Sequence, residues 1–216
     1  EGPISSQGEN RGSIYSFRAD PRAIVGLIFA GIDVVTLANN HTGDYGPEAL
    51  SETLEFLRWA EIDVVGAGVD MDDARKARFL EVNDMKIAFL GTTPFSPLWL
   101  TRSDSMPAVA PFDEQLMVED IAMARKQGAD IVAVLLHWGN EYETKHLPSQ
   151  EEIAHHLVDA GATLIIGHHP HVVQEVERYR GGVIAYSLGN FVFDQNFSTD
   201  TDHGLLLKVV LSGKDI

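Results

Sequence analysis

The sequence contains no cysteine. Disulfide bonds, thiolate nucleophiles and cysteine-ligated zinc sites are therefore excluded, while the cellular compartment stays open. Basic residues are also few: 16 Lys and Arg stand against 32 Asp and Glu, which gives a formal net charge of −16. Such a charge repels a phosphate backbone, so we expect no nucleic-acid partner.

Long apolar runs are absent too. The longest, residues 23–32, stops at Asp33 and is about half of the roughly 20 residues that a spanning helix needs, so we expect no membrane span in this chain. The 216 residues are 44% hydrophobic and 22% charged, which is ordinary for a globular protein, and we predict a single domain over residues 1–216. Glu1 stands where a methionine would begin a complete chain, which is consistent with removal of a leader, an anchor or a first strand.

Helix-like and strand-like segments alternate from Pro21 onwards, the pattern of a layered α/β domain. The residues around Asn83 and Asp84 predict one hairpin, and the Gly181-Gly182 pair predicts another. The helices are expected at 21–30 (buried), from Pro47 onwards, at 113–127 and from a capping box at Ser149 to 160; the strands are expected at 33–38, 63–66, 79–82, 86–92, 130–136, 163–166, 175–179, 183–188 and 204–211.

Residues 93–112 contain four of the nine prolines together with Phe95 and Trp99. The segment is too broken for a regular element and too apolar for an inert linker. Long loops of this kind within compact domains are usually functional, so we predict a lid or a specificity loop.

Polar clusters directly follow several of the apolar strands. Strand ends on one side of a helix-covered sheet converge on a ligand site, so we expect these clusters to form one histidine-rich pocket. The clusters are Asn39-Asn40-His41, His137-Trp138-Gly139, His168-His169-Pro170-His171 and Gly189-Asn190.

Imidazole is the commonest transition-metal ligand, and amide and carboxylate oxygens suit harder divalent ions, so this set indicates a site for Mn, Fe or Zn. In His169-Pro170-His171 the proline restricts the backbone between two potential ligands. A single histidine at a strand end is more often a hydrogen-bonded structural residue, but the combined set favours a metal site. We interpret the remaining histidines as solvated or structural: His146, His155, His156 and His203.

Several short motifs resemble those of one known family, in order and from the first residue to near the last. They are residues 1–4, Leu37-Ala-Asn-Asn-His41 with Asp44-Tyr-Gly46, Gly66-Ala-Gly68, Leu136-His-Trp-Gly139 with Glu141-Tyr142, Gly167-His-His-Pro-His-Val172 with Gln174, and Tyr186-Ser-Leu-Gly-Asn-Phe191. The chain thereby resembles the CapA-type capsule and poly-γ-glutamate biosynthesis proteins, a branch of the calcineurin-like metallophosphatase superfamily.

The resemblance implies a metallophosphatase-like αββα sandwich of two mixed sheets flanked by helices, here without its N-terminal strand. It also implies roles for individual residues. The metal ligands would be Asn40, His137, His169 and His171, and Glu1 would stand in place of a bridging aspartate, with two ions in the complete protein.

We accordingly expect a metal-dependent hydrolase of the phosphoesterase type, linked to capsule or poly-γ-glutamate biosynthesis. His41 would be the general acid or charge stabiliser, and Asp44 would orient it or serve only as a turn residue. Asn190, His168 and Trp99 are the candidate substrate-binding residues.

Two alternatives stay open, because a charge of −16 gives no long-range attraction to an anionic polymer. One is a non-hydrolytic polymer-binding or export accessory protein, and the other is an amide-bond hydrolase or transferase acting on the polymer. Other capsule-synthesis proteins are expected partners, and the resemblance implies a cell-envelope, extracytoplasmic location.

Overall fold

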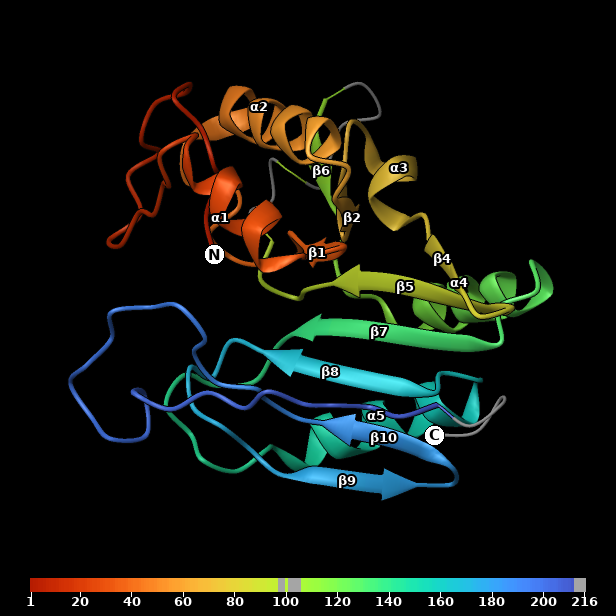
Figure 1. Ribbon diagram of the computed structural model, residues 1–216. Coiled ribbons are helices and arrows are strands. Elements are labelled where there is room, and N and C mark those ends of the chain that lie inside the picture. The colour runs from red at the N-terminus through yellow and green to blue at the C-terminus, as the bar shows by residue number, and fades with distance from the viewer. Residues whose placement is uncertain (97–99, 101–105, 212–216) are drawn as a thin grey trace. The chain divides into compact units, whose positions relative to one another are not determined.

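The computed structural model describes residues 1–96, 100 and 106–211 (Figure 1). The backbone divides into two compact units: unit 1 is Glu1–Arg78 with Gly91–Phe112, and unit 2 is Phe79–Leu90 with Asp113–Ile216. The chain therefore enters unit 2, returns to unit 1 and enters unit 2 again. The single domain predicted over residues 1–216 stays a prediction.

Unit 1 contains short strands and three helices among its described residues. β1 and β2 pair in parallel, with Val34 opposite Asp63, whereas β3 and β6 pair antiparallel. Along the chain the elements are α1 (Ala23–Ala30), β1 (Val34–Thr36), α2 (Gly46–Trp59), β2 (Asp63–Val65), β3 (Ala67–Gly68), α3 (Met71–Arg75) and β6 (Ala108–Val109).

Helix α2 supplies much of the core of unit 1. Pro47 lies in its first turn, where a missing N–H costs nothing, as expected. Leu50, Leu54 and Leu57 are all buried, which confirms the apolar face predicted from their spacing.

Helix α1 ends as predicted but is not buried as predicted. Gly31 adopts the left-handed conformation (φ 68°), and its N–H donates to the Ile28 carbonyl at 3.0 Å. Only Ile24 of this helix is buried, while Val25 is 60% and Phe29 92% exposed. The interpretation as a buried helix is therefore wrong: the segment is apolar all round, so composition could not indicate which side the core covers.

Unit 2 is built on a six-stranded sheet in the order β4-β5-β7-β8-β10-β9. β8 pairs in parallel with both β7 and β10, and β9 is antiparallel to β10. Helices α4 and α5 cover one face of this sheet (Figure 1). Its elements are β4 (Arg78–Val82, with Arg78 still in unit 1), β5 (Met85–Thr92, whose end returns to unit 1), α4 (Glu114–Lys126), β7 (Ile131–His137), α5 (Pro148–Asp159), β8 (Leu164–His168), β9 (Val176–Tyr179) and β10 (Gly182–Ala185).

Both predicted hairpins are present in the sheet. Asn83 (φ 51°) and Asp84 (φ 63°) connect β4 to β5, and Arg180 (φ 45°) and Gly181 (φ 85°) connect β9 to β10. Two successive positive φ angles twist the chain in the sense that paired strands need.

The start of α5 differs from the prediction. The helix begins at Pro148, and the backbone N–H of Leu147 donates to Gln150 Oε1 at 2.9 Å. Ser149 is thus within the helix and does not cap it, because Pro148 is already suited to the first helical position.

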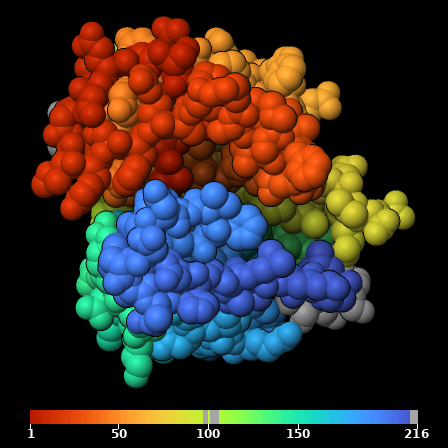
Figure 2. Space-filling view, turned by 60° about the vertical axis from the view of Figure 1, so that its left-hand side comes forward, coloured from red at the N-terminus to blue at the C-terminus, as the bar shows by residue number. Residues whose placement is uncertain are grey.

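The C-terminal segment crosses the other face of the sheet of unit 2 and forms part of this unit's surface (blue in Figures 1 and 2). The strand expected at 204–211 is reduced to a bridge between Gly189 and Gly204. Its alternation still holds: Leu207 and Val209 pack on the core, whereas Leu206 is 83% exposed. Alternation of apolar and polar residues thus predicts that the backbone is extended, but it does not predict whether that backbone pairs with another strand.

The proline-rich segment 93–112 is more regular at its end than predicted. β6 pairs with β3, Thr93 bridges to Pro111, and Leu100 is buried, while Phe95 is 38% exposed. Trp99 lies outside the described residues. None of the helices in the described ranges has the length and apolar character that a bilayer crossing requires.

Candidate functional site

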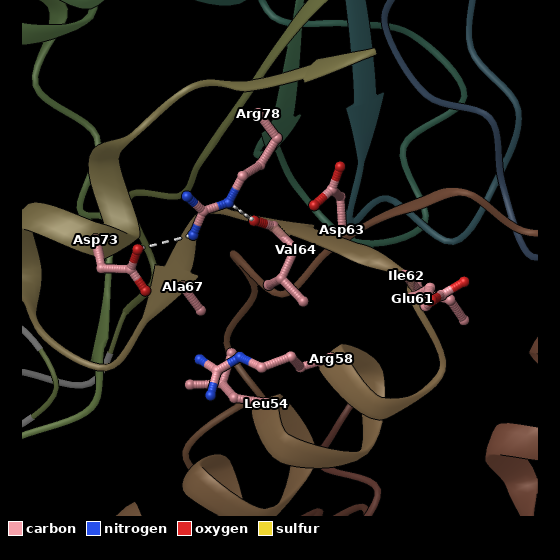
Figure 3. A pocket seen from close by; sticks show the side chains of 9 residues that line it. All are labelled: Leu54, Arg58, Glu61, Ile62, Asp63, Val64, Ala67, Asp73 and Arg78. Atoms are coloured by element: carbon pink, nitrogen blue, oxygen red, sulfur yellow. Dashed lines mark hydrogen bonds and ion pairs between the residues drawn. The ribbon is translucent and has the colours of Figure 1, made fainter.

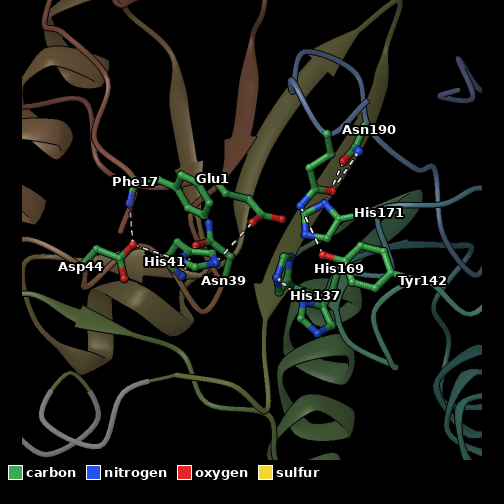
Figure 4. Close-up of polar contacts among 11 residues, drawn as sticks. Glu1, Phe17, Asn39, His41, Asp44, His137, Tyr142, His169, His171 and Asn190 are labelled. Atoms are coloured by element: carbon green, nitrogen blue, oxygen red, sulfur yellow. Dashed lines mark hydrogen bonds and ion pairs between the residues drawn. The ribbon is translucent and has the colours of Figure 1, made fainter. Parts of the chain in front are cut away.

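In unit 1 the turn between β1 and α2 brings His41 and Asp44 together (Figure 4). Asp44 is buried, and its Oδ2 accepts hydrogen bonds from His41 Nδ1 at 2.9 Å and from the Phe17 N–H at 2.8 Å. A carboxylate accepts only, so the Nδ1 atom of His41 carries a proton and Nε2 is the nitrogen left for chemistry. Asp44 also belongs to the turn, since its N–H donates to the His41 carbonyl at 3.1 Å.

Asn39 and Phe17 support this pair. The Asn39 Oδ1 accepts from the His41 N–H at 2.8 Å, and the Phe17 ring meets the His41 ring edge to face at 4.5 Å. The sequence analysis singled out neither residue. Asn39 was visible in the motif that ends at His41, whereas Phe17 lies far away in the sequence and carries no local signal.

Glu1 and Asn40 are the other predicted site residues of unit 1 that the structure describes. Glu1 Oε2 lies 3.9 Å from His41 Nε2, at the limit of an ion pair. Asn40 is half-buried in the turn beside His41. Their roles as metal ligands stay predictions.

In unit 2 the histidines gather where β7 and β8 end. His137 and His168 are the last residues of these strands and lie opposite each other in the parallel register. The loop that follows turns His169 back, so that its Nδ1 atom lies 3.1 Å from His137 Nε2 (Figure 4). Because parallel strands end at the same edge of the sheet, His137 and His169 lie side by side although they are far apart in the sequence. This agrees with the prediction for the histidines at the ends of these two strands.

The spacing of these two nitrogens suits a metal ion. Two nitrogens that each lie about 2.0–2.1 Å from one ion, at tetrahedral or octahedral angles, are roughly 2.8–3.4 Å apart. The pair His137–His169 falls within that interval. Across the described part of the chain, no group of three or more His, Asp or Glu side chains is arranged to hold an ion, so the pair accounts for two ligand positions.

The backbone of the loop is held in an unusual conformation. His169 has φ 99° and His171 has φ 60°, angles that L-residues rarely adopt and that cost about 1–3 kcal/mol each. Between them, the Pro170 carbonyl accepts a hydrogen bond from the Tyr142 N–H at 2.8 Å. Strain of this kind persists only where surrounding contacts enforce it, and it commonly marks functional loops.

His171 is buried and lies against Asn190. Its Nδ1 atom is 2.8 Å from Asn190 Oδ1, and Asn190 Nδ2 donates to the Thr201 carbonyl at 3.0 Å. The structure therefore pairs the predicted substrate-binding residue Asn190 with a predicted ligand.

The electrostatic environment of the cluster favours neutral imidazoles. Burial, together with the neighbouring His169 and His168, holds the pKa of His137 well below its usual range. Burial lowers the pKa of His168 to about 4. Both rings are uncharged at neutral pH, the state in which a ring nitrogen has a free lone pair.

An aromatic rim borders this cluster and was not found in the sequence analysis. Tyr142 stacks on His171 with ring centroids 6.1 Å apart, Phe193 lies 5.2 Å from the same ring, and Phe197 meets Tyr142 at 5.2 Å. Tyr142 was part of a quoted motif, but nothing in the sequence linked it to His171.

The remaining histidines lie elsewhere on unit 2. His156 is exposed and pairs with Glu114, as expected for a solvated side chain. His155 is instead half-buried, since it stacks on Tyr179 at 3.7 Å, so the prediction of a solvated His155 is wrong.

Unit 1 also contains a cavity of about 510 Å³ that no sequence motif indicated (Figure 3). Arg78 borders it, held by Asp73 Oδ1 at 2.8 Å and by the Val64 carbonyl at 3.1 Å. The lining consists of Leu54, Arg58, Glu61, Ile62, Asp63, Val64, Ala67, Asp73 and Arg78, none of which is a predicted site residue.

Comparison with known proteins gives a consistent result. The family model for "Bacterial capsule synthesis protein PGA_cap" matches residues 1–195. The chain is 39% identical over 180 residues to the capsule biosynthesis protein CapA of Bacillus anthracis, covering 82% of this chain and 44% of that protein. It is 42% identical over 174 residues to the PGA biosynthesis protein CapA of Bacillus subtilis, covering 80% and 46% respectively. The chain thus spans less than half the length of these two relatives.

Among solved structures, a candidate 5′-nucleotidase from Staphylococcus aureus is similar to this chain. The TM-score is 0.55 with 21% identity, covering 78% of this chain and 34% of that one. At this identity the likeness concerns the fold alone. It supports the predicted mixed α/β architecture of metallophosphatase type, with sheets flanked by helices.

Proposed function

Because the chain belongs to the bacterial capsule synthesis protein family, we propose that it is a metal-dependent hydrolase of the phosphoesterase type that acts in capsule or poly-γ-glutamate synthesis. The observation that carries the proposal is the 3.1 Å separation of His137 Nε2 and His169 Nδ1, the spacing of two ligands of one ion.

In this proposal His137 and His169 supply two ligands of a divalent ion such as Mn, Fe or Zn. His171, Asn40 and Glu1 are further ligands that the family resemblance implies, and the whole protein would hold two ions. When bound, the metal would supply Lewis acidity towards an ester oxygen and a water molecule of lowered pKa. The strained loop at Pro170 preorganises two of the imidazoles, which lowers the entropy cost of binding.

His41 is the proposed acid of the reaction. In this step His41 begins with a proton on both ring nitrogens. Water attacks phosphorus and loses a proton to solvent, the bond from phosphorus to the leaving oxygen breaks, and the Nε2 proton of His41 passes to that oxygen, which leaves His41 neutral with its proton on Nδ1. Asp44 holds the opposite nitrogen at 2.9 Å and stabilises the protonated ring, which makes it a positioning residue.

The proposed substrate is a phosphoester or an anionic polymer of the capsule, at the cell envelope. With a net charge of −16, the protein would depend on the metal and on local donors for affinity, not on long-range attraction. Asn190 and His168 are the candidate contacts near the metal. In the proline-rich segment, Trp99 and Phe95 are the candidate contacts to the polymer.

The first experiment measures metal content and Zn²⁺ affinity after purification without chelator. We expect about one or two equivalents in the wild type and a loss in His169→Ala, as two-site metal hydrolases require. His156→Ala is the matched control, because His156 is exposed and pairs with Glu114. Equal metal content in the His169→Ala and wild-type proteins would reject the ligand assignment.

Turnover of a generic phosphodiester then distinguishes hydrolase from accessory protein. His41→Ala should retain metal but lose roughly 10²–10⁴-fold in rate, the usual contribution of an acid–base group. Metal binding without phosphodiester turnover, but with cleavage of poly-γ-glutamate, would instead identify the amide-bond hydrolase or transferase. Binding of the polymer without any cleavage would identify the accessory protein.

A further inference from the structure

Asn190 Nδ2 lies 3.0 Å from the carbonyl oxygen of Thr201 and 3.3 Å from Gln195 Oε1. A carbonyl oxygen can only accept a hydrogen bond, so the amide nitrogen of Asn190 must face Thr201. This contact fixes the orientation of the amide, which otherwise has two nearly equivalent states.

With the nitrogen on Thr201, the Asn190 Oδ1 atom faces His171 Nδ1 at 2.8 Å. An amide oxygen only accepts, so Nδ1 must carry the proton. In a neutral imidazole the lone pair then resides on Nε2. The hydrogen-bond chain from Thr201 through Asn190 therefore selects one tautomer of His171.

The segment around Asn190 is folded to hold that amide in place. Thr201 is buried, and its N–H and hydroxyl bond back to Ser198. Gly189 precedes Asn190 with φ 68°, and a Cβ there would lie 2.7 Å from the carbonyl oxygen of His203. Residues 189–203 thus form a closed loop that presents Asn190 to His171.

We propose that Asn190 is a positioning residue, which locks His171 in the Nδ1–H tautomer and leaves the lone pair on Nε2, the nitrogen that the proposed function would use for a metal. Metal binding by Nε2 rests on the proposed function. The tautomer of His171 does not, because it follows from the hydrogen bonds of Asn190. It assigns to Asn190 a role beyond substrate contact, and it explains the hydrogen bond between Asn190 and the loop carbonyl of Thr201.

The tautomer is measurable without metal or substrate. Long-range ¹H–¹⁵N spectra of metal-free protein at about pH 8, above the ordinary histidine pKa of about 6.5, report which ring nitrogen is protonated. We expect Nδ1–H for His171 in the wild type and in Asn190→Asp, whose carboxylate still accepts from Nδ1. In Asn190→Leu we expect loss of this preference. The Nε2–H form in the wild type would overturn the proposal.

Zn²⁺ titration gives the second readout. Loss of a residue that orients a metal ligand typically costs about 10–100-fold in affinity, so Asn190→Leu should bind Zn²⁺ that much more weakly than the wild type. Asn196→Leu, the same chemical change at an exposed position of the same loop, is the matched control and should bind like the wild type.

These two arms separate the proposals. Unchanged tautomer and unchanged affinity in Asn190→Leu would overturn the role of Asn190. The Nδ1–H tautomer in a wild-type protein that binds no Zn²⁺ would reject the proposed function and leave the tautomer lock supported.

Discussion

Replacement of Asp44 tests the unit 1 cluster by a change in stability. Its Oδ2 atom accepts from both Phe17 and His41 at less than 3 Å, and only 3% of the residue is exposed. Asp44→Ala leaves a partly buried N–H and an imidazole N–H without acceptors, at about 1–3 kcal/mol each. We therefore expect a loss of about 2–6 kcal/mol in the free energy of unfolding.

Two further variants sharpen this prediction. Asp44→Asn keeps an oxygen for both donors but loses the charge, so it should cost only about 1 kcal/mol. His41→Ala removes one of the two donors, and its combination with Asp44→Ala should show a coupling energy of roughly 1–2 kcal/mol.

The assay is equilibrium unfolding in urea, followed by circular dichroism. Asp33→Ala is the matched control, since Asp33 is an exposed aspartate of the same unit and should change stability by no more than about 0.5 kcal/mol. The reasoning is refuted if Asp44→Ala unfolds like the control, or if Asp44→Asn is as unstable as Asp44→Ala.

Three other substitutions test packing and hydrogen bonding. Gly167→Ala would place a Cβ only 1.8 Å from the Tyr186 carbonyl oxygen, so we expect a loss of more than about 2 kcal/mol in thermal unfolding, and a wild-type melting curve would contradict it. Gly26 lies in the interior of α1, and an added Cβ would meet no neighbouring side chain within 4 Å. Gly26→Ala should therefore stabilise the protein by about 0.5–1 kcal/mol, and a lowered melting temperature would contradict this. Arg125 donates five hydrogen bonds, among them two to the Gly161 carbonyl, which an ammonium group cannot replace. Arg125→Lys should lower the free energy of unfolding by about 2–3 kcal/mol, measured in urea. An unchanged urea midpoint would show that these hydrogen bonds do not contribute to stability.

Much of the fold could be predicted because its causes are local. A proline suits the first turn of α2, and Asn83 and Asp84 tolerate the left-handed backbone of a hairpin turn. The same reasoning failed where a local pattern has two outcomes. α1 is apolar all round and turned out to be mostly exposed, and the alternating segment at 204–211 pairs only at the bridge between Gly204 and Gly189.

The candidate site was predictable as a set of residue types at strand ends. Histidines at the ends of β7 and β8 had to lie near one another, since parallel strands of one sheet end on the same side. Residues such as Phe17 and Tyr142 could not be assigned to it. These residues contact the site from segments far apart in the chain, and neither residue spacing nor secondary-structure propensity predicts such contacts.

By itself, the sequence determined which chemical groups this protein can use: imidazoles and amide or carboxylate oxygens, no thiols, and a strongly acidic surface. Only the tertiary structure decided which atoms of those groups meet. His137 Nε2 faces His169 Nδ1, and His171 Nδ1 faces Asn190, whose amide is oriented by Thr201. A hydrogen bond depends on distances of tenths of an ångström and on which atom carries the proton, and these are set by the packing of whole segments.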